Sequence, residues 1–149
     1  MTYAVELTID NEEFEEKKYR SKISPIKNRR CKWDEVCYDY ALKKLAKARG
    51  EYIWCCENGF NFLDEFFNQI NIEDAKAGDI ITYHEINDFK SKYEKPCGGN
   101  CMHFGIITKT DGTIEGTTIE SKWGEEKVYK TKIADVADIY GNAVVIWKI

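Results

Sequence analysis

The C-terminal half of the chain is a series of short β-rich runs separated by turn residues, and this pattern constrains the fold most. The runs are rich in Ile, Val, Thr, Tyr and Phe, which favour strands, and each is short for a helix. The Asp111-Gly112 pair between two of the runs is the strongest short-range signal of a hairpin. The pattern predicts an antiparallel sheet with strands over residues 78–84, 103–109, 113–120, 127–132 and 143–149.

The N-terminal half has a helical period instead. Asp34 is a suitable N-cap for a helix whose apolar residues recur every three or four positions and which stops at Gly50. A second helix is predicted over residues 61–70. Helices followed by antiparallel strands indicate an α+β domain. We expect residues 1–149 to form this one domain, with residues 1–30 as an N-terminal arm.

Charge and hydropathy exclude several classes of partner. The net charge of −4 gives no broad cationic surface, so neither nucleic acid nor an anionic membrane is expected as a partner. The N-terminus lacks the basic start and apolar block of a signal peptide, and no run reaches the ~20 apolar residues of a membrane span. We therefore expect a cytoplasmic location. There, the six cysteines would be thiols, metal ligands or a nucleophile.

Cys37 stands where a helix would activate a thiol. With Asp34 as N-cap, Cys37 is the third helical residue, where unpaired backbone N–H groups and the helix dipole stabilise a thiolate. Cys37 also shares a helical face with Trp33 and Ala41. Because free cysteines are commonly buried, a purely structural role is the alternative.

His103 and Glu120 complete a candidate site. His103 heads a predicted strand, so its imidazole can lie at the sheet edge facing the start of the helix, within reach of a thiol. A two-residue hairpin centred between Asp111 and Gly112 would set Glu120 opposite His103. A carboxylate there would orient the imidazole and raise its pKa. The alternative is a cross-strand pair of structural value only.

The order of these motifs resembles a known family. A cysteine at the start of a helix, then a GDIITY strand, then HFGII and a polar residue one hairpin later is similar to the papain-like NlpC-type and CHAP-type cysteine amidohydrolases and peptidases. The resemblance covers roughly residues 30–149. The later Ser-Lys-Trp-Gly also resembles small bacterial and phage members.

The resemblance implies a papain-like fold and a cysteine hydrolase that needs no cofactor and no metal. Cys37 would be the nucleophile, His103 the general base and acid, and Glu120 the orienting group. The expected partner is a peptide or amide small molecule, and peptidoglycan peptides are the family's usual substrates.

Two features depart from the family pattern. Val36 precedes Cys37, where CHAP-type enzymes usually carry a glutamine that helps to form the oxyanion hole. Residues 84–101 form an insertion before His103, where a shorter loop is usual. A papain-like domain without catalysis, serving as a binding module, is therefore an alternative.

Other residues compete for the same roles. Cys31, in a basic turn, is the second candidate nucleophile, and Ser121 is the second candidate for the third residue of the triad. His84, the other imidazole, ends the predicted GDIITYH strand.

The remaining cysteines offer a different class of function. Cys97-x3-Cys101-x-His103 provides three zinc-ligand side chains on one loop, and Cys55-Cys56 or Cys31 could complete a tetrahedral site. A Cys97–Cys101 disulfide and inert thiols are further alternatives.

Overall fold

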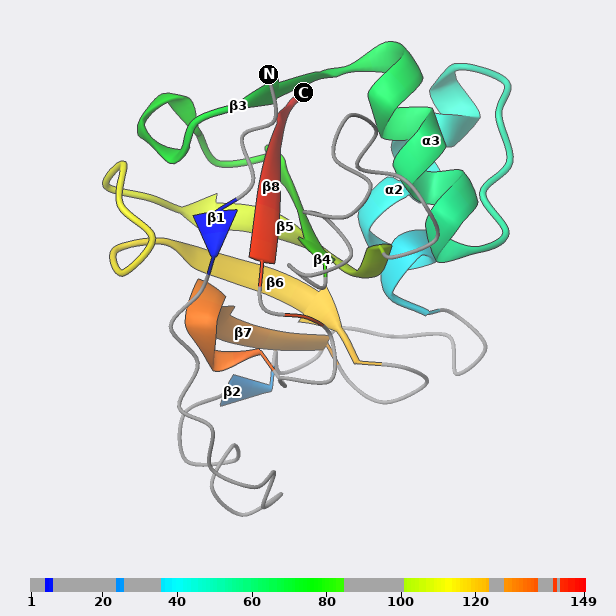
Figure 1. Cartoon of the computed structure of the whole chain (residues 1–149). Coiled ribbons are helices and arrows are strands. Elements are labelled where there is room, and N and C mark those ends of the chain that lie inside the picture. The colour runs from blue at the N-terminus through cyan, green and yellow to red at the C-terminus, as the bar shows by residue number, and fades with distance from the viewer. Residues whose placement is uncertain are drawn as a thin grey trace.

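Two α-helices packed on one antiparallel sheet make up the fold (Figure 1). The computed structural model describes residues 5–6, 24–25, 36–84, 101–123, 128–136, 141 and 143–149. The helices are α2 (Cys37–Ala48) and α3 (Cys56–Phe66). The strands are β1 (Val5–Glu6), β2 (Ser24–Pro25), β3 (Asn68–Ile70), β4 (Ile80–His84), β5 (Cys101–Lys109), β6 (Thr118–Lys122), β7 (Val128–Lys132) and β8 (Ala143–Lys148). The predicted α+β class is confirmed.

The described strands form one sheet in the order β1-β8-β4-β5-β6-β7-β2, and β3 also pairs with β8. Every pairing is antiparallel. β1 and β2 both come from the segment that we expected to be an N-terminal arm, and they pair at opposite edges of the sheet. This segment therefore contributes to the sheet, at least at residues 5–6 and 24–25.

Strand alternation divides the sheet into two faces. The face that packs on α2 and α3, here called the helix face, carries Ile80, Cys101, Phe104, Ala143, Val145 and Trp147. The opposite face carries Ile81, Tyr83, Ile107, Ile119, Trp123, Val144 and Ile146. Figure 1 shows both helices on one side of the sheet. Because both faces are covered, residues 143–147 of β8 are all buried.

The helix boundaries differ from the prediction. The N-cap of α2 is Val36 rather than Asp34, and the backbone N–H of Val36 donates to the Asp39 carboxylate at 3.3 Å. Cys37 is therefore the first helical residue. At the other end Gly50 has φ of +70° and follows the last turn, as predicted.

The second helix begins at Cys56 instead of residue 61 and ends at Phe66. Packing explains why Gly59 lies inside it: a Cβ there would stand 3.0 Å from the Phe104 ring. Residues 68–70 leave the predicted helix because they pair with β8. Within the described residues, no helix has the length and apolar character to span a membrane.

Gly141 is required by a close backbone approach. It has φ of +107°, and a Cβ would overlap the His84 carbonyl group. Gly78 has a similar φ of +97° but open space around it. We expect Gly78→Ala to lower the free energy of unfolding by about 1–2 kcal/mol through backbone strain alone. Gly141→Ala should cost about 3 kcal/mol or more, since steric overlap is added.

Urea unfolding followed by tryptophan fluorescence measures both variants. Equal losses in the two variants would contradict the close approach of Gly141 to His84.

Candidate functional site: a thiol pair at two helix starts

Cys37 lies at the start of α2 and at the head of β5. Its side chain is 7% exposed and packs in the helix-face core. The sulfur accepts a hydrogen bond from the backbone N–H of Phe104, which by itself lowers the thiol pKa. The helix that carries Cys37 therefore packs beside the residue that follows His103.

Cys56 is the first residue of α3 and lies next to Cys37. Its N-cap is Cys55, whose sulfur accepts the backbone N–H of Asn58 at 3.3 Å. The Cys37 thiol donates a hydrogen bond to the Cys56 sulfur. This bond lowers the pKa of Cys56 and, together with burial, raises the pKa of Cys37. Cys37 and Cys56 are here called the thiol pair. Loss of the first proton from this pair is easier than from a separate thiol, and loss of the second proton is harder.

Cys101 is a third thiol on the helix face. It is 4% exposed, and burial, followed by the nearby charge of Cys56, raises its pKa well above the ordinary value. Cys101 is therefore a neutral thiol beneath the pair.

His103 lies on the opposite face from Cys37. It is the β4 partner of Tyr83, and the two ring centroids are 5.6 Å apart. Phe104, the next residue, points to the helices. The structure therefore brings the His103 backbone close to Cys37, but it does not bring the imidazole to the same side of the sheet.

Burial controls the protonation of His103. The side chain has no exposed surface, and desolvation of its charged form lowers the pKa of His103 to about 3. This is opposite to the raised pKa that the sequence predicted. The imidazole ring of His103 is thus neutral at physiological pH.

Glu120 does not face His103, because the predicted hairpin is wrong. The β5–β6 register pairs Glu120 with Ile106 and Thr118 with Lys109. Residues 110–117 form a longer loop, in which the Thr110 and Thr117 hydroxyl groups are 2.7 Å apart and the Asp111 carboxylate accepts the Thr113 N–H at 2.9 Å. A loop closed by its own side chains replaces the two-residue turn.

Glu120 lies beside α2 instead. The Tyr40 hydroxyl donates to Glu120 Oε2 at 2.8 Å, and both side chains are half-buried on the helix face. Ser121 points to the opposite face, where its hydroxyl accepts the Trp123 indole N–H at 3.1 Å. Of the two candidates for the third residue, Ser121 therefore shares a face with His103 and Glu120 shares one with Cys37.

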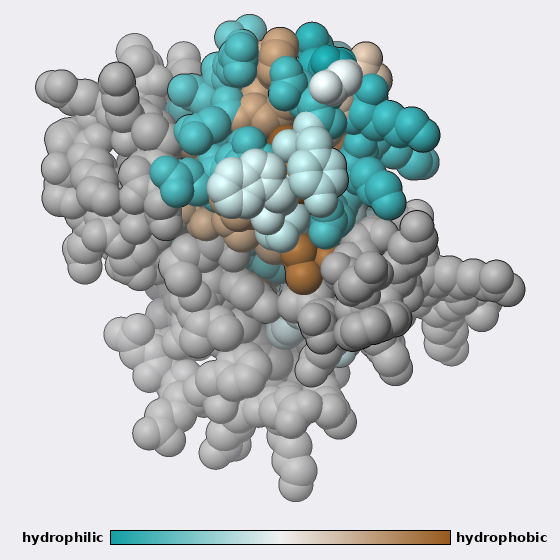
Figure 2. Space-filling view, turned by 90° about the vertical axis from the view of Figure 1, so that its right-hand side faces the viewer, coloured by the Kyte–Doolittle hydropathy of each residue, from teal (hydrophilic) through white to brown (hydrophobic). Residues whose placement is uncertain are grey.

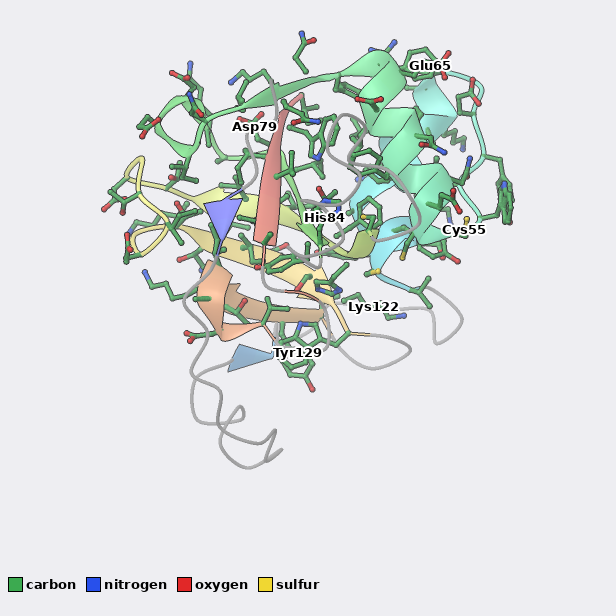
Figure 3. All side chains as sticks on the ribbon, viewed as in Figure 1. Cys55, Glu65, Asp79, His84, Lys122 and Tyr129 are labelled. Carbon is green, nitrogen blue, oxygen red and sulfur yellow. The ribbon has the colours of Figure 1, made fainter. Side chains whose placement is uncertain are left out.

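Two other buried polar side chains lie on the helix face. Lys122 has no exposed surface, and Figure 3 shows it at the end of β6 that points toward the start of α2. His84 Nε2 lies 2.8 Å from the Thr82 hydroxyl, and its ring packs edge-on against Phe60. His84 is thus the described imidazole on the same face as the thiols.

Exposed aromatic side chains lie in the segment that joins α2 to α3. Tyr52 is 79% exposed and Trp54 is 64% exposed, and the Tyr38 hydroxyl donates to the Trp54 carbonyl at 3.0 Å. The space-filling view shows a pale group of side chains among hydrophilic ones on this side of the molecule (Figure 2). These aromatic rings adjoin Cys55 and Cys56 in the chain and offer a stacking surface beside the thiol pair.

The predicted zinc site is not assembled in the described part of the chain. Cys101 and His103 point to opposite faces, so they cannot chelate one ion from this strand. Among the described residues, no group of three or more His, Cys, Asp or Glu side chains could hold a metal ion. Cys31, Cys97 and residues 85–100 of the insertion lie outside the described residues.

Sequence reasoning missed the role of Cys56, which it considered only as a zinc ligand. The usable signal was the helical spacing of Phe60 and Leu63 after it, which extends the second helix back to Cys56. Comparison with family models, curated proteins and solved structures finds no match to this chain. The site is therefore interpreted from its own geometry.

The buried His103 should make the protein less stable in acid. Its pKa is about 3 in the folded state and about 6.5 in the unfolded state, so the unfolded chain binds an extra proton between these values. The stability linked to neutral His103 is complete above about pH 6.5 and is lost as the pH falls toward 3. Between about pH 7.5 and pH 5 we expect a loss of about 2 kcal/mol that a His103→Gln variant does not show.

The measurement is urea unfolding of both proteins across this pH range, with NMR of the His103 ring protons as a direct check. Parallel pH dependences in the two proteins, or a His103 midpoint near 6.5, would contradict the burial of this ring.

The Tyr40–Glu120 hydrogen bond should link α2 to β6. We expect Tyr40→Phe to lower the free energy of unfolding by about 1–2 kcal/mol, because a hydrogen bond to a carboxylate is lost. Glu120→Gln should cost less in a Tyr40→Phe background than in the wild type, which a double-mutant cycle of chemical unfolding measures. Additive losses would show that the two side chains do not interact.

Proposed function

We propose that this protein is a cysteine-dependent hydrolase of amide bonds, with a papain-like arrangement and Cys37 as the nucleophile. The observation that carries the proposal is the position of the Cys37 sulfur. It lies at the first residue of a helix and accepts the backbone N–H of Phe104 in β5. The order of a cysteine helix, a GD strand and an HFGII strand, which underlies the resemblance, agrees with a helix packed on that strand.

The thiol pair supplies the first proton transfer. As the Cys37 sulfur forms a bond to the substrate carbonyl carbon, the Cys37 proton passes along the existing hydrogen bond to the Cys56 sulfur. The tetrahedral intermediate then expels the amine, which takes the proton from Cys56, and leaves a thioester on Cys37. Water hydrolyses the thioester, releases the acid and restores the thiol.

The start of α2 supplies donors for the oxyanion. The first backbone N–H that donates within this helix is that of Tyr40, which bonds the Val36 carbonyl at 3.0 Å. The N–H groups before it, including that of Cys37, have no acceptor within the helix. A carbonyl oxygen placed against this first turn would receive them, which removes the need for a glutamine at position 36.

His103 acts as the general base that activates the water in the second step, the hydrolysis of the thioester, and it does so only when its ring reaches the helix face. The strand has a β-bulge there, since Tyr83 pairs with His103 while His84 pairs with Cys101. A one-residue change of register at a bulge moves a side chain to the other face. In the proposed active state His103 therefore joins Cys37 on the helix face, where Glu120 already lies.

The substrate class follows from the surface next to the thiols. The exposed rings of Tyr52 and Trp54 suit a peptide-type substrate that stacks on aromatic side chains. Among such substrates, the resemblance favours a peptidoglycan peptide.

Turnover of an activated acyl donor tests the nucleophile. With p-nitrophenyl acetate as the probe, we expect Cys37→Ala to lower kcat/KM by about 100-fold or more, because the acyl-enzyme cannot form. Cys56→Ser should lower it by about tenfold and shift the pH profile, since only the proton acceptor is lost. Cys55→Ser is the matched control, because Cys55 neighbours Cys56 and takes no part. Full turnover by Cys37→Ala would overturn the proposal.

The two imidazoles form a second matched pair. His103→Ala should reduce turnover strongly and His84→Ala weakly, if His103 is the base. The reverse order would move the base to His84.

A papain-like binding module is the second candidate function, favoured by the position of the His103 ring in the described structure. If the protein is such a module, p-nitrophenyl acetate should acylate its thiols once, and neither the wild type nor any variant should turn the probe over.

A further inference from the structure

We propose that Cys37 and Cys56 form a redox-active dithiol that exchanges with low-molecular-weight disulfides and closes to a disulfide joining the first turns of α2 and α3. This activity is separate from amide hydrolysis and does not depend on it.

The first observation is the contact between the two thiols. Cys37 and Cys56 begin two helices that pack against each other, and their side chains are hydrogen-bonded. Both also belong to one packed cluster on the helix face. Because the sulfur atoms are hydrogen-bonded neighbours in the reduced protein, a disulfide forms when they approach to the bond length of about 2.05 Å.

The second observation is a division of roles within the pair. Cys56 is partly exposed, whereas only 7% of the Cys37 surface is accessible. Cys56 also accepts the hydrogen bond from Cys37, which lowers the pKa of Cys56 and favours its thiolate. The thiolate is the species that attacks a disulfide, and attack needs access. Cys56 is therefore the attacking thiol and Cys37 the resolving thiol.

The exchange balances in two steps with glutathione disulfide as the oxidant. The Cys56 thiolate attacks one sulfur of glutathione disulfide, forms a mixed disulfide and releases one glutathione thiolate, which takes the Cys37 proton. The Cys37 thiolate then attacks the Cys56 sulfur and releases the second glutathione as a thiolate, which is protonated by water. Two protein thiols are oxidised and one glutathione disulfide is reduced.

The neighbouring thiols are poorly placed for either role. Cys55 caps α3, and its sulfur accepts the Asn58 N–H at 3.3 Å, so its side chain is directed to the helix backbone. Cys101 is 4% exposed and its pKa is raised by burial. Both are therefore matched controls.

One consequence rests on the proposed function. A Cys37–Cys56 disulfide removes the nucleophile and its proton acceptor together, so oxidation would switch the hydrolase off and a reductant would restore it.

The test uses the reduced full-length protein and glutathione disulfide. After incubation, acid and N-ethylmaleimide trap the remaining thiols, and mass spectrometry maps the products. The Cys55→Ser background is used for mapping, since Cys55 and Cys56 are adjacent. We expect the protein to lose two free thiols and to carry no attached glutathione. One cross-linked peptide pair should contain Cys37 and Cys56.

Single variants separate the two steps. Cys37→Ser should accumulate one glutathione on Cys56, because the resolving thiol is missing. Cys56→Ser should react at Cys37 about tenfold or more slowly, since a buried neutral thiol attacks poorly. Cys101→Ser should form the Cys37–Cys56 disulfide at the wild-type rate. Circular dichroism of each variant checks that it is folded.

The mapping in the Cys55→Ser background decides the proposal even where a Cys37 or Cys56 variant fails to fold. A cross-link of Cys56 to any cysteine other than Cys37, or a stable glutathione adduct in place of a cross-link, would overturn it. None of these readouts involves an amide substrate, so failure of the dithiol and failure of the hydrolase are distinguishable.

Discussion

The β-bulge between β4 and β5 determines which side chains of the candidate site meet. Without a bulge, residues 101 and 103 would share a face of the sheet. With it, Cys101 pairs with His84 and faces the helices, while His103 pairs with Tyr83 and faces away. The bulge therefore separates the imidazole from the thiols, and it also prevents Cys101 and His103 from binding one metal ion.

The surroundings favour a negative charge on the Cys56 sulfur and disfavour a positive charge on the His103 imidazole. The His103 ring is enclosed beside Tyr83, and burial keeps it neutral. The thiol pair lies at the N-termini of two helices, where backbone N–H groups favour a negative charge. A cysteine–histidine enzyme needs the proton to move from thiol to imidazole. In the described arrangement the Cys37 thiol donates its proton in a hydrogen bond to the Cys56 sulfur instead.

The sequence predicted what depends on local pattern. Short β-rich runs between turn residues predicted four of the five strands to within two residues, and the helical period predicted α2 with its stop at Gly50. Those signals are local in composition and spacing, so they need no knowledge of distant residues. The candidate site was harder, because it depends on register.

The predicted register failed at one particular loop. Asp111-Gly112 suggested a two-residue turn, but Asp111 is held by Thr113 and the Thr110 and Thr117 hydroxyl groups close a longer loop. Glu120 is consequently opposite Ile106, three positions from His103. The bulge has no sequence signal of its own here, whereas the helical spacing of Phe60 and Leu63 could have placed Cys56 at the start of the second helix. Register and bulges are tertiary choices that a single sequence does not express.

Two hydrogen bonds of Trp54 and one buried side chain fix the segment between the two helices. The Trp54 carbonyl accepts from the Tyr38 hydroxyl at 3.0 Å, and the Trp54 N–H donates to the Asn58 side chain at 3.1 Å. Both hydrogen bonds are exposed, and the Trp54 ring lies largely in solvent. Ile53, in the same segment, is 5% exposed and belongs to the helix-face core, so the exposed rings of Tyr52 and Trp54 stand on an anchored backbone. Because Cys37 is almost fully buried while its partner Cys56 is not, amide hydrolysis would require a substrate carbonyl to reach a covered sulfur, whereas a small disulfide needs only the exposed side of Cys56. The two proposed reactions of the pair thus differ in how far the surroundings of Cys37 must open.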